Sequence, residues 1–137
     1  MQAMSGTVLA GLKHSATIEV TPELTVPSLP AMGLVDMPPV FATAYMVAFI
    51  ETTCIAALKP HLEAGRHSVG THIDVSHLAA TPLGMHVTAE VELIAAEGRK
   101  LRFKVRCRDD KDLIGEGFHE RVIIDVAKFM ARVEAKR

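Results

Sequence analysis

The chain has 137 residues, of which 49% are apolar, so it is long enough for one domain with a packed core. Only 4% of the residues are aromatic and the formal net charge is −1. This composition argues against a base-stacking nucleic-acid module and against a general attraction for phosphate polymers.

The N-terminal stretch has no basic segment followed by a long apolar run, so it does not predict a signal peptide. No repeat, low-complexity run or linker divides the chain, and we expect residues 1–137 to form a single domain. The two cysteines, Cys54 and Cys107, share no motif spacing and are expected as buried thiols in a reducing compartment. We therefore expect a soluble, cytoplasmic protein.

The first third of the chain predicts a strand and then a long loop. Residues 12–20 predict a first strand, which ends at Thr21-Pro22. Residues 22–39 contain five prolines and a glycine, which predicts a connection without regular structure. Loops of this length often serve as lids or binding segments.

A helix of four or five turns is expected from about Thr43 to Leu58. Thr43 fits the N-cap position after an extended Pro-Pro-Val-Phe run, and Pro60 ends the helix. The apolar stretch around this helix contains Glu51 and three threonines, which favours a buried helix over a membrane span.

Four strand-like segments and a short tail follow the helix. They span residues 69–79, 87–95, 101–107 and 113–126, and residues 127–136 are expected as a short amphipathic helix or tail. Alternation places these side chains on the inner faces: Ile73, Val75, His77, Ala79, Val87, Ala89, Val91, Leu93, Ala95, Leu101, Phe103, Val105 and Cys107.

This order of elements predicts an α+β architecture. Only the central helix is apolar enough to cover the inner face of the sheet. A long central helix wrapped by a curved antiparallel β-sheet is the hot-dog fold. Because one layer of sheet leaves open edges, we expect pairing into at least a dimer.

Three polar residues stand out against the apolar core. Glu51 is the only charged residue between Asp36 and Lys59, and a carboxylate in such surroundings is costly to bury unless it is paired. His77 lies by alternation on the helix-facing side, either as a core histidine or as a general base. Thr43 is either a simple N-cap, or a nucleophile or carbonyl-orienting group beside the free amides of a helix N-terminus.

Gly70 and Arg121 are further candidates. Gly70 either relieves crowding or allows a ligand to approach the backbone closely. Arg121 is either a solvated strand charge or a clamp for an anionic ligand tail. The seven histidines and two cysteines show no zinc-site spacing, and no phosphate-binding glycine motif is present, so no metal or nucleotide cofactor is predicted.

Several of these segments together resemble the fluoroacetyl-CoA thioesterase-like family of the hot-dog superfamily. They are Pro39 to Glu51, which reads PVFATAYMVAFIE, Gly70 to Gly84, which reads GTHIDVSHLAATPLG, and the run GEGFHER ending at Arg121. The resemblance implies a homodimeric acyl-CoA thioesterase that needs no metal or cofactor. It implies a Thr-Glu-His triad at Thr43, Glu51 and His77 near a dimer interface, with substrate contacts at Gly70 and Arg121.

The loop before the helix departs from that family. The fluoroacetyl-CoA-selective enzyme carries phenylalanines in this lid loop, whereas Leu34 and Met37 stand there in this chain. Because methionine is flexible and adapts to varied shapes, we expect a different or broader short acyl group.

Four other interpretations remain open from the sequence. One is a hot-dog enzyme for aryl or longer acyl thioesters, and another is a hydratase-like relative. A third is a non-catalytic protein that binds or senses acyl-CoA. The fourth is a structural dimer in which Glu51 and His77 form a buried pair, where loss of one partner would cost about 3–5 kcal/mol.

Overall fold

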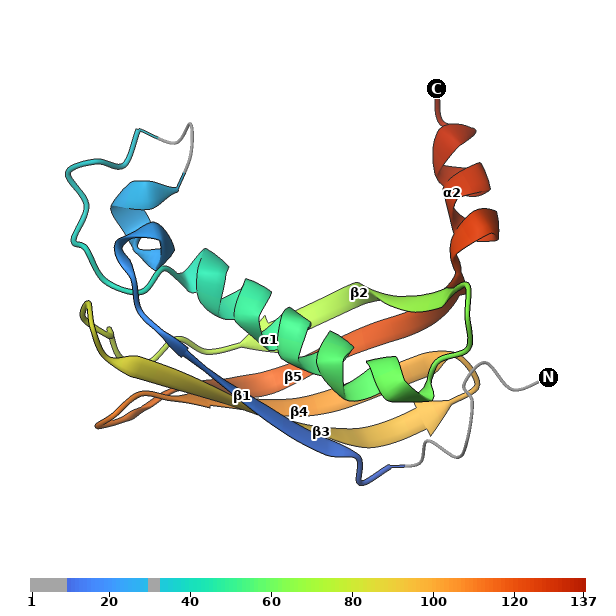
Figure 1. Ribbon diagram of the computed structural model, residues 1–137, viewed down its shortest axis with the longest axis horizontal. Coiled ribbons are helices and arrows are strands. Elements are labelled where there is room, and N and C mark those ends of the chain that lie inside the picture. Colours follow the sequence, from blue (N-terminus) through green and yellow to red (C-terminus); the bar gives the residue numbers. More distant parts are fainter. Residues whose placement is uncertain (1–9, 30–32) are drawn as a thin grey trace.

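A five-stranded antiparallel sheet curls around one long helix (Figure 1). The computed structural model describes residues 10–29 and 33–137. The N-terminal stretch without a predicted signal peptide, and residues 30–32 of the predicted lid loop, lie outside the described residues.

The elements follow the predicted order. The strands are β1 (Lys13–Glu19), β2 (Arg66–Val75), β3 (His86–Glu97), β4 (Lys100–Arg108) and β5 (Leu113–Asp125), and the helices are α1 (Thr43–Leu58) and α2 (Val126–Glu134). Short 3-10 helices span Pro22–Leu24, Val26–Ser28 and Lys59–His61. The strand order is β1-β3-β4-β5-β2, and every pairing is antiparallel. The predicted hot-dog architecture is confirmed.

The core lies between α1 and the concave face of the sheet (Figure 1). The buried side chains of α1 recur every three or four residues, which is the spacing of one helix face. They are Met46, Phe49, Ile50, Thr53, Cys54, Ala57 and Leu58. Alternating apolar residues of β3 and β4 cover this face, as predicted from their period of two.

Two bulges change the predicted alternation. The β2–β5 register shifts between Gly70 and His72, and β2 ends at Val75, so His77 lies beyond the strand. The β3–β4 register shifts between Leu93 and Ala95, and as a result Ala96 packs against the core. A bulge inserts one extra residue into a strand, which reverses the faces of the residues beyond it.

β2 is an edge strand of the described sheet and is ten residues long. Most of its side chains are exposed, including Ile73 at 40%. The outer face of α1 carries Ala44, Ala48 and Ile55, and Glu51 is its only charged residue, whereas a helix facing water typically has several. Helix α2 projects away from the sheet (Figure 1).

Candidate active site

The start of α1 is held by the loops around it. Phe41 N donates to the Thr81 carbonyl at 2.9 Å, and Ala42 N donates to the Leu24 carbonyl at 3.0 Å. Ala42 is the N-cap, so Thr43, predicted as the cap, is the first residue of the helix. The Thr43 side chain instead contacts His77, with 2.6 Å between Oγ1 and Nδ1.

The segment that carries His77 runs beside β5. Backbone hydrogen bonds on both sides of the histidine fix it there: Ser76 N donates to the Glu116 carbonyl at 2.9 Å, and Leu78 N donates to the Ile114 carbonyl. His77 therefore reaches α1 from the loop after β2. The sequence predicted the same helix-facing side, but as a residue within the strand.

The His77 imidazole is half-buried, and this burial lowers its pKa from the usual value of 6.5. The ring is therefore neutral at pH 7 and can accept a proton. Its Nε2 atom is buried and has no hydrogen-bond partner among the described residues. A buried polar atom without a partner is costly, so this nitrogen is a point where a further group is expected to bind.

Glu51, Gly70 and Arg121 meet in a second cluster. Arg121 is only 3% exposed, and its Nη1 donates to Glu51 Oε2 at 2.9 Å. The same guanidinium donates from Nε to Ser68 Oγ at 2.7 Å and from Nη2 to the Ser68 carbonyl at 2.8 Å. The Glu51 side chain itself is 40% exposed, so it is a paired carboxylate at the surface of the chain.

Gly70 makes room for that carboxylate. A Cβ atom at this position would lie 2.7 Å from Glu51 Oε2 and 3.2 Å from His119 Cε1. Both contacts are shorter than ordinary van der Waals distances, so any other residue would displace the Glu51 side chain or the His119 ring. Relief of crowding, one of the two roles that the sequence suggested for Gly70, therefore agrees with the structure.

Within the chain these two clusters remain separate. Thr43 and Glu51 are eight residues apart on α1, which corresponds to a rise of about 12 Å along the helix. Glu51 pairs with Arg121 rather than with His77. The two lid-loop candidates lie before α1, with Leu34 half-buried and Met37 44% exposed.

Sequence reasoning missed two residues of the Glu51 cluster, His119 and Ser68. His119 is 2% exposed, and its Nε2 lies 3.0 Å from Arg121 Nη1. The alternation of β5 contained the signal, since counting back by twos from the apolar Ile123 places Arg121 and then His119 on the inner face.

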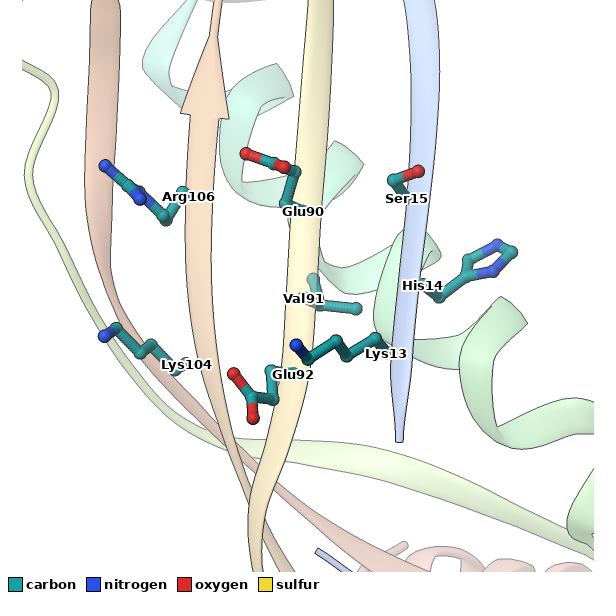
Figure 2. Close-up of a pocket in the computed structure, with 8 residues that line it drawn as sticks. All are labelled: Lys13, His14, Ser15, Glu90, Val91, Glu92, Lys104 and Arg106. Atoms are coloured by element: carbon teal, nitrogen blue, oxygen red, sulfur yellow. The ribbon is translucent and has the colours of Figure 1, made fainter. Parts of the chain in front are cut away.

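A hollow of about 490 Å³ lies elsewhere, on the outer face of the sheet (Figure 2). It is lined by charged side chains of both signs from β1, β3 and β4, and it contains none of the candidate residues. In the part of the chain that the structure describes, no cluster of three or more metal-binding side chains is found. Nor does any helix among residues 10–29 and 33–137 have both the length and the apolar character to cross a membrane.

Comparison with known proteins gives a consistent picture. The model of the fluoroacetyl-CoA-specific thioesterase family matches residues 20–127. The fluoroacetyl-CoA thioesterase of Streptantibioticus cattleyicolor is 48% identical over 101 residues, which cover 74% of this chain and 73% of that protein.

Solved structures agree with this match. A structure of the fluoroacetyl-CoA thioesterase FlK is 40% identical, with a TM-score of 0.92 over 96% of this chain and 99% of that one. A Thermus thermophilus thioesterase superfamily member is 31% identical, with a TM-score of 0.85 over 94% of this chain and 93% of that one. The chain therefore belongs to the fluoroacetyl-CoA-specific thioesterase family, a family of hot-dog thioester hydrolases.

Proposed function

We propose that this protein is a homodimeric acyl-CoA thioesterase that hydrolyses a short acyl-CoA to the free acid and coenzyme A. The observation that carries the proposal is the 2.6 Å contact between Thr43 Oγ1 and His77 Nδ1 at the start of α1, in a member of this family. Structures of FlK variants in complex with acetyl-CoA and with fluoroacetate support a coenzyme A thioester as the substrate class.

The helix N-terminus suits the charge that develops on a thioester carbonyl oxygen. The first amides of an α-helix have no intrahelical acceptor, and the Ala42 cap supplies no side-chain hydrogen bond to them. These amides and the helix dipole would stabilise the oxyanion. Gly70 and Arg121 are proposed to contact the substrate from the second cluster.

His77 acts as the general base in this mechanism. It takes the proton either from Thr43 Oγ1 or from a water that Thr43 orients, and the resulting nucleophile adds to the carbonyl carbon. The C–S bond then breaks, and the coenzyme A thiolate takes the proton back from His77. In the first route water subsequently hydrolyses an acyl-threonine ester, whereas in the second the acid forms directly.

Glu51 of a second copy is proposed to complete the triad. His77 Nε2 is buried without a partner among the described residues, while Glu51 is half-exposed and about 12 Å along α1 from Thr43. The exposed β2 edge and the outer face of α1, on which Glu51 is the only charged residue, are surfaces that pairing would cover. A carboxylate has enough lone pairs to accept from both Arg121 and a histidine.

The lid loop is proposed to set the choice of acyl group. Leu34 and Met37 are aliphatic and lie on the loop that leads into α1. A flexible Met37 side chain adapts to several acyl shapes, so we expect a broader range of short acyl groups than a selective fluoroacetyl-CoA enzyme accepts.

The first test is thiol release from acetyl-, fluoroacetyl-, propionyl-, butyryl-, phenylacetyl-, benzoyl- and a medium-chain acyl-CoA, followed with a colorimetric thiol reagent. Burial raises the pKa of both Cys54 and Cys107 to about 12, so the native protein itself should not consume the reagent. His77→Ala should lower kcat/KM on the best substrate by about 100-fold or more, because the base is lost. Tight binding of a panel member with no release by the wild-type protein would instead indicate an acyl-CoA-binding protein.

The second test asks whether two copies share one site. Glu51→Gln and His77→Ala subunits, each expected to keep only a small residual turnover alone, are co-expressed with different tags so that mixed dimers can be isolated. A shared site predicts that the isolated mixed dimers have about half of wild-type activity, because one of their two sites is intact. A Thr43→Ala and His77→Ala mixture is the matched control, since both changes fall on the same half-site and no activity should return. No recovery in the first mixture would contradict the shared site while leaving the thioesterase activity untouched.

A further inference from the structure

A second histidine lies beneath Glu51 and takes no part in the chemistry described above. His119 comes from β5 and is 2% exposed, and both of its ring nitrogens have partners. Nδ1 lies 2.7 Å from the His72 carbonyl oxygen, next to the β2 bulge. Because a carbonyl only accepts, Nδ1 must carry the proton and donate it.

This assignment fixes the role of the other nitrogen. In the neutral ring Nε2 then holds a lone pair and accepts from Arg121 Nη1 at 3.0 Å. The two hydrogens of Nη1 are divided between His119 Nε2 and Glu51 Oε2, the second at 2.9 Å. His119 Nε2 and Glu51 Oε2 lie 3.8 Å apart. Both atoms are acceptors, so there is no direct hydrogen bond between them.

We propose that His119 is a positioning residue: as a neutral acceptor it aims Arg121 Nη1 at Glu51 and so holds that carboxylate in its working orientation. This inference rests on the proposed role of Glu51 in catalysis. The order of contacts is the His72 carbonyl, His119, Arg121 and Glu51, which connects the bulge of β2 through β5 to α1.

Burial of the ring favours its neutral form. Burial lowers the pKa of His119 from the usual value of 6.5, and Arg121 on β5 also lowers it. The His72 carbonyl on β2, Glu51 on α1 and Glu120 on β5 act in the opposite direction without reversing the shift. A protonated ring would also point an N–H at Arg121 Nη1, which removes the acceptor and repels the guanidinium.

Two near-isosteric variants separate positioning from simple burial. In His119→Gln the amide oxygen falls near the place of Nε2 and keeps an acceptor for Arg121. In His119→Asn the shorter amide falls near the place of Nδ1 and keeps a donor for the His72 carbonyl, but leaves Arg121 without its acceptor. A merely structural role would make the two variants equally active, or would favour His119→Asn.

The experiment measures kcat and KM for thiol release from the best acyl-CoA of the panel, with thermal unfolding as the check on folding. We expect His119→Gln to stay within about threefold of wild-type kcat/KM and His119→Asn to lose about tenfold or more, mainly in kcat. In a Glu51→Gln background His119→Asn should change kcat by less than about twofold, because its effect passes through Glu51. Equal loss in both backgrounds, or equal activity of the two His119 variants, overturns the inference.

A second readout does not depend on activity. Nitrogen-15 NMR of the wild-type protein at pH 6.5 should show His119 as the neutral Nδ1–H tautomer, and an Nε2–H tautomer or an imidazolium would overturn the inference even if His119→Asn failed to fold. Failure of the proposed function appears differently, as the absence of thiol release from the wild-type protein.

Discussion

The orientation of the Glu51 carboxylate depends on its contact with Arg121 and on the free space beside Gly70. Arg121 uses four donor contacts, two of them to Ser68, so the guanidinium is fixed before it reaches the carboxylate. A lysine has no planar fork and would not reproduce these contacts. The remaining space is set by Gly70, which has no Cβ atom to press on Glu51 Oε2.

Gly70→Ala should therefore damage activity more than stability. The new methyl group would start 2.7 Å from Glu51 Oε2, so the exposed carboxylate must turn away while the buried core stays packed. We expect kcat/KM to fall by about tenfold or more, because Glu51 is proposed to be catalytic and small misplacements of a catalytic group are costly. Thiol-release kinetics measure this loss, and thermal unfolding of the same variant should show little change. A large loss of stability with normal kinetics in the folded fraction would contradict this account of Gly70.

The turn between β4 and β5 links distant elements to the start of α1. Asp109 Oδ1 accepts from the backbone amides of Lys111 and Asp112, and Oδ2 accepts from Thr81 Oγ1, each at 2.8 Å. Thr81 is fully buried, and its carbonyl accepts from Phe41 N just before Thr43. One carboxylate thus supports the loop against which the helix N-terminus is placed.

Asp109→Ala should destabilise the protein by about 1–3 kcal/mol, because it leaves the buried Thr81 hydroxyl and two turn amides without their acceptor. Asp109→Asn is the matched control, since its amide oxygen still accepts from the turn, and its loss should be smaller. Urea unfolding at pH 7 gives both free energies. Partial burial raises the pKa of Asp109, but the hydrogen bonds from Lys111, Asp112 and Thr81 outweigh it and lower that pKa. Equal stability of the wild type and Asp109→Ala would show that this turn does not depend on the carboxylate.

The protein as a whole should lose stability in mild acid through its two inner histidines. Burial lowers the pKa of both His77 and His119 below 6.5. At a pH between their folded and unfolded pKa values, these histidines bind more protons in the unfolded chain than in the folded chain. The free energy of unfolding contributed by these groups is complete above pH 6.5 and is lost as the pH falls from 6.5 toward their lower folded pKa values.

Urea unfolding at a series of pH values between 7.5 and 5 measures this loss. His119→Gln has one fewer buried imidazole, so its stability should fall less steeply below pH 6.5 than that of the wild type. His67 is exposed, and His67→Gln serves as the control that should leave the slope unchanged. Parallel curves for the wild type and His119→Gln would contradict the assignment of the acid sensitivity to His119.

The local hydrophobic pattern of the sequence was enough to predict the helices and strands and the fold class. The period of α1 marks its buried face from Met46 to Leu58, and the period of two in β4 marks Leu101 to Cys107 as inner residues. Both patterns follow from backbone geometry and the burial of apolar side chains, which act over a few residues. The membership of the family was also readable, since its motifs are short runs of sequence.

The partners of the site residues required the folded chain. Thr43 meets His77 across 34 positions, and Glu51 meets Arg121 across 70. Such contacts depend on strand register, including the shift at Thr71, next to which the His72 carbonyl contacts His119. A bulge shifts register by one residue and leaves little trace in the hydrophobic pattern, so the bulge of β2 could not be read from alternation. Alternation also extended the predicted strand to His77, whereas β2 ends at Val75. The sequence contained the chemical groups, and long-range packing determined which of them meet.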